Sequence, residues 1–307
     1  MRFNKLDLNL LVALDALLAE RSITKAARRL NLSQSATSGV LARLREYFDD
    51  DLLVQVGRNM VPTALAESLI EPVSNILLQI EATIETRATF NPAESQRHFR
   101  IVASDYATCV AVAHLVRQLS IDAPGITLDI IMPSQATLER AERGGIDLVL
   151  IPRNTPGMEE AASELLFTDT YSCVICANNP LVGERLTLED YLGMAHVATR
   201  FGDHTSMFED WFFDRAGLHR RIELTASQFN TLPQLVLGTR RIATMHTRMA
   251  LISANYYPIR VLPPPMAIPE VEMMMKWHRY LDNDPGHQWL RQAFRSVMQK
   301  QPARPGA

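Results

Sequence analysis

Small polar side chains, hydroxyls and an amide, are concentrated in one short stretch, Asn31–Leu41 ("NLSQSATSGVL"). An apolar series starts within it and continues to Phe48. At about 100° per residue, this series forms an inward side and leaves Gln34, Ser35 and Ser38 facing outward. Glutamine can pair with adenine edges, serine is a tolerant donor or acceptor, and a helix N-terminus suits a phosphate. The stretch therefore predicts the start of a helix that reads DNA.

The surrounding elements predict a winged helix-turn-helix. Apolar residues at helical spacing, with N-caps at Ser22 and Ser33, indicate three helices over residues 7–20, 23–30 and 33–48. Asn31 can adopt the left-handed turn that ends the second helix. Alternating residues on both sides of Gly57-Arg58-Asn59 predict a two-stranded wing. Plain N-capping would explain Ser33 alone, but not a polar cluster on the second helix of a helix-turn-helix with a wing behind it.

Charge gives this assignment weak support. The whole chain has a net charge of −3, which excludes a generally basic nucleic-acid binder. Up to Pro62, however, the sequence holds nine Lys/Arg against seven Asp/Glu. An arginine at the wing tip is placed to reach a phosphate or the minor groove. The candidate DNA-binding residues are Ser33, Gln34, Ser35, Ser38, Arg43, Arg45 and Arg58.

A long helix is predicted after Thr63, which would cap it. Its apolar residues step by 4, 4, 3, 4 and 4, a spacing typical of a seam that pairs with another helix. We find no obvious partner in the same chain and therefore predict a dimerisation helix; the alternative is a helix packed on its own domain. Pro72 is expected to kink it. The seam comprises Leu65, Leu69, Val73, Ile76, Ile80 and Ile84.

The pattern changes after "NPAESQRH". Residues 99–152 read as a β-α-β-α-β series, which predicts a parallel sheet, and a second series starts near Asp169. After the proline-rich "LPPPMAIPE", a strand over 271–279 and a helix over about 285–299 suggest a return to the first lobe. Two lobes joined by two crossovers form a clamshell with a ligand cleft.

The predicted fold class is thus α/β, with an N-terminal winged helix-turn-helix, a long linker helix and a C-terminal two-lobed domain. We assign residues 1–62 to DNA binding, 63–90 to the linker and dimerisation helix, and 91–307 to effector binding. Within the last segment, lobe I covers about 97–167 and 269–303, and lobe II covers about 168–268.

In such clamshells, ligands meet the carboxyl ends of strands and the N-termini of helices. Arg200 could hold a carboxylate, and the apolar candidates suit a flat ligand with an anionic end. Structural alternatives stay open: an ion pair for Arg200, an N-cap for Ser134, and core packing for the aromatic residues. The candidate effector-binding residues are Ser104, Asp105, Tyr106, Pro133, Ser134, Ile151, Arg200, Phe201, Phe229, Met245 and His246.

Composition limits the other functions. The 307 residues fit about two domains, and no apolar run is long enough for a membrane span. The N-terminus lacks the features of a signal peptide, so we expect a cytoplasmic protein without membrane contact. There is no glycine-rich phosphate loop and no convincing nucleophile–base set, so we expect neither an enzyme nor a cofactor. A solute-binding protein is a weaker alternative.

The cysteines define a further alternative. Cys109, Cys173 and Cys176 are too few for a disulfide framework. Cys173-x-x-Cys176 is half a zinc site, and in a strand its members point to opposite faces, so we expect no metal. A thiol-switched regulator remains the alternative to a ligand-switched one.

The segment "LDLNLLVALDALLAERSITKAARRLNLSQSATSGVLARLREYFDDDLLV" with "GRNMVPTALAESL" resembles the N-terminal domain of LysR-type transcriptional regulators. "HVATRFG", "RIATMH" and "VEMMMKWHRYLDNDPGHQWLRQ" are similar to the nodulation-regulator and aromatic-responsive (NodD/NahR-like) branch. Ser35, Gly39 and Leu53 depart from the usual family pattern, which puts the base preference in doubt.

The resemblance covers nearly the whole chain. It implies a periplasmic-binding-protein-like effector domain, a linker-helix dimer and assembly as a homotetramer. The implied partners are double-stranded promoter DNA, a small-molecule effector such as an aromatic or other organic acid, and further copies of the chain, with RNA polymerase as a further candidate.

Overall fold

The fold is taken from a computed structural model that describes residues 8–57, 59–85, 90–200, 212–213 and 215–301. The chain divides into two compact units. The first contains Met1–Ala88 with Arg143–Gly145, and the second contains Thr89–Glu142 with Ile146–Ala307. Within the described ranges, no helix is both long and apolar enough to cross a membrane.

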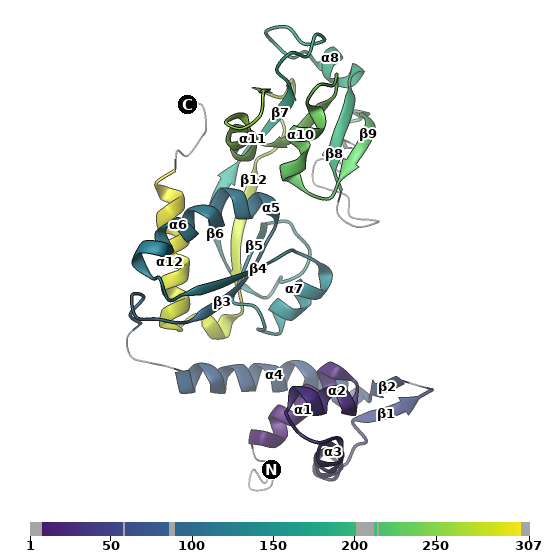
Figure 1. The fold of residues 1–307 in the computed structure, drawn as a ribbon. Coiled ribbons are helices and arrows are strands. Elements are labelled where there is room, and N and C mark those ends of the chain that lie inside the picture. Colours follow the sequence, from purple (N-terminus) through teal and green to yellow (C-terminus); the bar gives the residue numbers. More distant parts are fainter. Residues whose placement is uncertain (1–7, 58, 86–89, 201–211, 214, 302–307) are drawn as a thin grey trace. The chain divides into compact units, whose positions relative to one another are not determined.

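The first unit has the predicted order of elements (Figure 1). Ser22 and Ser33 cap their helices by accepting hydrogen bonds from backbone N–H groups, and Asn31 has a φ of 55° in the turn between them. The helix-turn-helix and its antiparallel wing are therefore confirmed. The elements are α1 (Leu8–Glu20), α2 (Ile23–Arg29), α3 (Gln34–Phe48), β1 (Leu53–Val56), β2 (Asn59–Pro62) and α4 (Ala64–Glu85).

Helix α4 packs partly on its own unit. Val73 is 4% exposed in the same core as Leu14 and Leu17 of α1, and Leu69 packs against that core. The expectation that the seam has no partner in its own chain is therefore wrong for this part of the helix. Leu65 and Ile76 are 38% and 45% exposed and remain available for another helix.

The first lobe of the second unit is a five-stranded sheet in the order β4-β3-β5-β12-β6. β3 pairs in parallel with β4 and β5, but β12 is antiparallel to β5 and β6, so the sheet is mixed rather than parallel. The return of the chain to this lobe is confirmed by β12. The strands are β3 (His98–Ala103), β4 (Thr127–Ile131), β5 (Leu148–Pro152), β6 (Ala162–Asp169) and β12 (Val271–Trp277).

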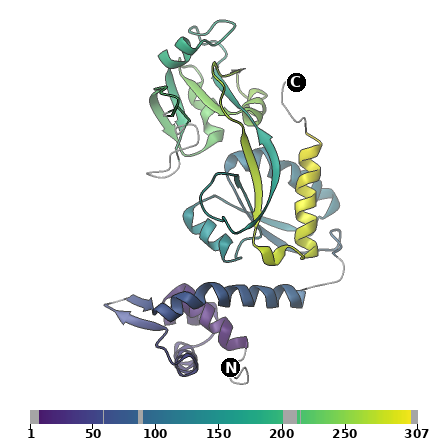
Figure 2. The same ribbon diagram turned by 180° about the vertical axis from the view of Figure 1, so that it is seen from behind.

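Helices cover both faces of this sheet. Figures 1 and 2 show α6 (Ala113–Asp122) and α12 (Pro285–Gln299) side by side on one face and α7 (Gln135–Glu142) on the other. The segment "FRIVASDY" predicts a strand that runs to Tyr106. In the structure β3 ends at Ala103, because Ser104 caps a short helix, α5 (Asp105–Ala107). A π-helical segment (Thr108–Val112) joins α5 to α6.

The second lobe has the order β11-β7-β10-β8-β9, again a mixed sheet, because β7 is antiparallel to β10 and β11. The sequence also predicts a helix around residues 208–216, most of which lies outside the described residues. The strands are β7 (Tyr171–Cys176), β8 (Ala195–Thr199), β9 (Arg221–Ala226), β10 (Ile242–His246) and β11 (Ile259–Leu262). The helices are α8 (Leu188–Gly193), α10 (Leu232–Val236) and α11 (Thr247–Ala254).

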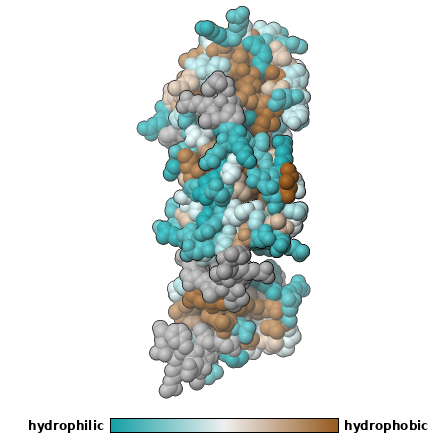
Figure 3. Space-filling model, turned by 90° about the vertical axis from the view of Figure 1, so that its left-hand side faces the viewer, coloured by the Kyte–Doolittle hydropathy of each residue, from teal (hydrophilic) through white to brown (hydrophobic). Residues whose placement is uncertain are grey.

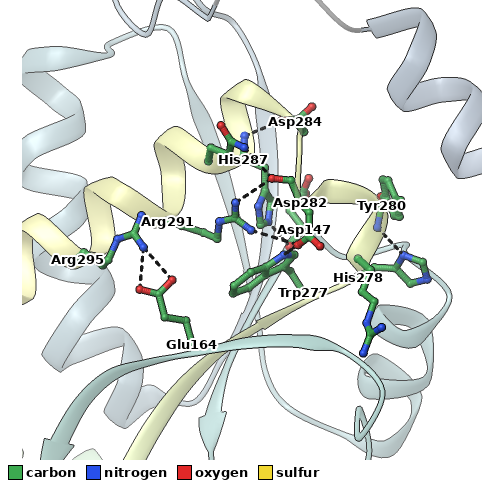
Figure 4. Close-up of polar contacts among 12 residues, drawn as sticks. Asp147, Glu164, Trp277, His278, Tyr280, Asp282, Asp284, His287, Arg291 and Arg295 are labelled. Atoms are coloured by element: carbon green, nitrogen blue, oxygen red, sulfur yellow. Dashed lines mark hydrogen bonds and ion pairs between the residues drawn. The ribbon is translucent and has the colours of Figure 1, made fainter.

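Polar contacts anchor α12 on the first lobe (Figure 4). Asp284 caps the helix by accepting the N–H of His287 at 2.6 Å. The His287 ring is fully buried and its Nε2 donates to the Asp147 carbonyl at 2.7 Å. Farther along, Arg295 binds both carboxylate oxygens of Glu164 at 2.8 and 2.9 Å. The chain that returns from the second lobe is thus fixed to the first.

Candidate DNA-binding surface and effector site

One side of α3 is apolar and buried, so the polar side chains at the start of the helix face solvent. Thr37, Leu41 and Leu44 are 0%, 3% and 0% exposed, whereas the side chains expected to contact DNA face outward. Ser33 fixes the start of the helix by accepting the N–H of Ala36 at 3.1 Å. The exposed candidates are Ser33, Gln34, Ser35, Ser38 and Arg43.

Two candidate arginines differ from this group. Arg45 donates from Nε to the Asp51 carbonyl at 2.8 Å and from its terminal nitrogen to the Leu53 carbonyl at 2.7 Å. Its guanidinium therefore holds the base of the wing against α3, and we leave Arg45 out of the proposed contacts. Arg58 lies outside the described residues.

The two lobes meet at the start of α5. Ser104 caps this helix by accepting the N–H of Ala107 at 3.2 Å. Asp105 accepts the backbone N–H of Asn230, a residue of the second lobe, at 2.7 Å. The strand-end residues of the first lobe thus face the second lobe, as the predicted clamshell requires.

Three candidate rings pack on one another between the lobes. Tyr106 stacks on His246 with ring centroids 3.9 Å apart, and Phe229 meets His246 edge-on at 4.9 Å. All three residues are 4% exposed or less. Burial lowers the pKa of His246 to about 3, so the ring is neutral at pH 7. In this structure the three rings are part of the hydrophobic core. They would have to separate before they could line a ligand-binding site.

A buried carboxylate connects the same ring cluster to the point where the chain passes from the first lobe to the second, between β6 and β7. Asp169, 3% exposed, ends β6 and accepts the Tyr106 hydroxyl at 2.7 Å. It also accepts the backbone N–H groups of Thr170 at 2.8 Å and Arg248 at 3.3 Å. Burial raises the pKa of Asp169, while these hydrogen bonds oppose the rise. Sequence reasoning missed this residue, although an aspartate between two largely apolar strands was a visible signal.

The remaining candidates are spread over the second unit. Arg200 is exposed, and its backbone N–H bonds the Ala226 carbonyl at 2.8 Å. Ser134 is exposed and caps the start of α7 through Thr137 at 3.2 Å, next to half-buried Pro133. The structure does not bring these residues into the ring cluster. Ile151 and Met245 are core residues at 2% and 0% exposure, and Phe201 lies outside the described residues.

The cysteines do not form a common site. Cys173 lies in the core, where burial raises the pKa of its thiol to about 12. Cys176 accepts the N–H of Gly238 at 3.3 Å, and hydrogen bonds from the backbone, that of Asn178 first, lower the pKa of its thiol. Within the described ranges, no cluster of three or more potential metal ligands occurs. Nothing here favours the thiol-switch alternative.

Family models match both units of the chain. Residues 8–67 match the "Bacterial regulatory helix-turn-helix protein, lysR family", and residues 92–299 match the "LysR substrate binding domain". The chain belongs to the LysR family of transcriptional regulators.

Individual relatives agree with this assignment. Nodulation protein D 2 of Rhizobium tropici is 42% identical over 293 residues, covering 95% of this chain and 93% of the relative. The crystal structure of the probable transcriptional regulator PA0477 from Pseudomonas aeruginosa is 29% identical with a TM-score of 0.64, covering 96% and 98% of the two chains. A structure of full-length CbnR complexed with its target DNA shares the fold, at 16% identity and a TM-score of 0.53, covering 95% and 100%.

This LysR-type regulator therefore combines a DNA-binding helix-turn-helix with a LysR substrate-binding domain built from two mixed α/β sheets. Its family consists of transcriptional regulators, and the similar PA0477 protein is described as a probable transcriptional regulator. We call the second unit the effector unit from here on.

Proposed function

We propose that this LysR-type regulator reads promoter DNA through the exposed N-terminal side of α3. The observation that supports this is the separation of the helix into a buried apolar side and an exposed side bearing Gln34, Ser35 and Ser38. A side-chain amide there can pair with an adenine edge in the major groove. Arg43, exposed farther along α3, would contact a phosphate without reading sequence.

Substitution at Gln34 tests base reading. Gln34→Ala is expected to lose about 1–3 kcal/mol on the selected site and to relax one base position. The matched control is Arg43→Gln, which is expected to weaken binding to all sequences and to reduce the salt slope by about one. Sites are selected from random duplexes and measured by fluorescence anisotropy. Equal losses for Gln34→Ala on selected and random DNA would remove its base-reading role.

We also propose that the regulator acts as a dimer or tetramer that can engage RNA polymerase. Exposed Leu65 and Ile76 on α4 support pairing with a second copy. Figure 3 shows apolar residues gathered on the viewed side of the first unit.

The effector, we infer, is a small organic anion, in particular an aromatic carboxylate, bound between the lobes. Support comes from groups of both lobes that meet there. The Asp105 carboxylate accepts the backbone N–H of Asn230, and the Tyr106 ring packs on Phe229 and His246. Exposed Arg200 at the end of β8 would pair with the carboxylate. The relatives named nodulation protein D add support for this regulator type, although their names specify no ligand.

Calorimetry on the full chain with benzoate-, indole- and flavonoid-like acids tests the effector class. Arg200→Gln is expected to weaken the best acid about tenfold, which equals about 1.4 kcal/mol. Arg221→Gln is the control, because its side chain is exposed in the same lobe and pairs with Glu223 at 2.7 Å. If Arg200→Gln binds the best acid as tightly as the wild type does, Arg200 has a structural role. If no acid of the panel binds, the proposal that the effector is an aromatic carboxylate is refuted.

A further inference from the structure

The chain enters the effector unit through a packed segment. Residues 90–97, called the entry segment from here on, precede β3. Glu94 donates its backbone N–H to the Asn91 carbonyl at 3.3 Å, and the Arg97 carbonyl accepts the N–H of Thr127 at 3.1 Å. Neither DNA reading nor effector binding uses this segment, yet its two ends and its middle each contact another part of the unit.

An aromatic ring anchors the first residue of the entry segment. Phe90 is half-buried and packs on Trp289 of α12, with ring centroids 5.3 Å apart. Gly286, in the first turn of α12, lies against the same ring: a Cβ at this position would lie 3.0 and 3.1 Å from two of its carbons. Carbon atoms are normally about 3.5–4.0 Å apart in contact. A side chain at Gly286 would therefore push the Phe90 ring away from α12.

The last residue of the entry segment is fixed to the same turn of α12. Arg97 donates from Nη1 to Asp284, the N-cap of α12, at 2.5 Å, and its other terminal nitrogen lies 3.9 Å from Asp147. A Cβ at Gly286 would lie 2.6 Å from the same Nη1. Both ends of the entry segment thus meet at the start of one helix, and Gly286 leaves room for both.

A second glycine accommodates the backbone of the segment. At Gly125, in the turn before β4, a Cβ would lie 2.5 Å from the carbonyl oxygen of Ser95. Because the neighbour is a backbone atom, no side-chain rotation could relieve this contact. Two glycines from distant parts of the chain therefore accept one segment, which a simple covalent connection would not require.

From these contacts we propose that Phe90 is a positioning residue that holds the exit of the linker on the effector unit, so that α4 and this unit move together. From Glu85, the last residue of α4, to Phe90 the chain can span at most about 18 Å. With Phe90 released, the next residue packed against a glycine is Ser95, and the possible span rises to about 36 Å. Release of one ring thus doubles the reach between α4 and its first anchor.

The anchor lies at one end of a strand that reaches the contacts between the lobes. β3 starts next to Arg97 and ends at Ala103, next to Ser104, which caps α5. Because the family models place substrate binding and DNA binding in different units, a change at the lobes has to reach the first unit to alter DNA binding. A fixed exit passes a displacement of β3 on to α4, whereas a loose one absorbs it. The positioning role therefore concerns regulation, whatever the effector is.

The proposal is tested by double electron–electron resonance on the full chain without DNA or ligand. Spin labels are attached to ketone-bearing residues that replace Glu46 of α3 and Glu139 of α7, two exposed side chains, so the native cysteines stay unlabelled. Labelled protein is mixed with excess unlabelled protein, so that only distances within one chain are measured. Because release doubles the reach, Phe90→Ala is expected to broaden the distance distribution about twofold.

Three further variants separate positioning from packing. Phe90→Tyr keeps the ring and is expected to retain the wild-type distribution. Gly286→Ala pushes the ring away from α12 and is expected to broaden the distribution as Phe90→Ala does. Gly193→Ala, at the end of α8, is the matched control and is expected to change nothing, because a Cβ there meets no heavy atom within 4 Å. A thermal melt accompanies each measurement.

Three results would overturn the proposal. A wild-type distribution in Phe90→Ala together with a lowered melting temperature would make Phe90 a packing residue only. Equal broadening in Gly286→Ala and Gly193→Ala would remove the role of the contact at Gly286. A wild-type distribution as broad as that of Phe90→Ala would show that the ring does not limit the exit. Failure of base reading at Gln34 or of the acids at Arg200 leaves this test untouched, because neither DNA nor ligand is present.

Discussion

Removal of the Tyr106 hydroxyl tests its hydrogen bond to Asp169, which ends β6 and also accepts the backbone N–H of Arg248 in the second lobe. The hydroxyl donates to a carboxylate at 2.7 Å, and both residues are at most 3% exposed. A hydrogen bond to a charged group contributes about 1.5–3 kcal/mol. Tyr106→Phe keeps the ring and its stacking on His246, so the loss is confined to the hydrogen bond. For a unit of this size, it corresponds to a fall in melting temperature of about 3–12 °C.

The loss of stability in Tyr106→Phe is expected to depend on pH in a defined direction. Burial raises the folded-state pKa of Asp169 above the unfolded value of 3.8, and the Tyr106 hydroxyl opposes that rise. The stability that this group contributes is full below the unfolded pKa and is lost as pH rises through the folded pKa. Without the hydroxyl the folded pKa rises further, so more stability is lost. The difference between variant and wild type therefore grows from acidic to neutral pH.

Tyr191→Phe is the matched control. Tyr191 is fully buried, and its hydroxyl bonds the Thr244 hydroxyl at 2.7 Å and also interacts with the Arg220 side chain. Because neither partner is a carboxyl group, its removal is expected to cost about 0.5–3 kcal/mol, with little change between pH 5 and 8. Thermal melts of both variants over this range, with Asp169→Asn in a double-mutant cycle, measure the coupling. A Tyr106→Phe effect that does not vary with pH, or that persists in full beside Asp169→Asn, would refute the reasoning.

The first unit yields two further predictions. Ile76→Glu places a charge on the exposed apolar part of α4 and is expected to give monomers with reduced DNA affinity; a fully dimeric variant in analytical ultracentrifugation would move the interface elsewhere. Ser33→Ala removes the N-cap of α3 and is expected to destabilise the unit by about 1 kcal/mol in chemical denaturation, whereas Ser33→Asp, which can still cap, is expected to restore it.

Local pattern predicted the first unit well, because its elements are specified by nearby residues. The caps at Ser22 and Ser33 and the turn at Asn31 are each set within four positions of the chain. Strand direction in the effector unit is not local in this way. β12 runs antiparallel to β5 because the chain returns from the second lobe, and no periodicity within Val271–Trp277 carries that information.

The site illustrates the same limit. Topology correctly placed Asp105 and Tyr106 at a strand end facing the other lobe. The burial of Tyr106, however, depends on residues more than 60 positions away, namely Asp169 and His246. Exposure at a junction of two lobes is set by how they close, which sequence spacing does not encode.

The contacts between the lobes define what an effector must do. Asp105 accepts the N–H of Asn230, and the Tyr106 ring stacks on His246. The Tyr106 hydroxyl is held by Asp169 within the first lobe. All of these begin at α5, so separating the rings for a ligand strains the neighbouring hydrogen bonds too. A ligand shifts the population of lobe arrangements only by its difference in affinity between them. An inter-lobe acid must therefore replace the ring contacts that are lost when the rings separate.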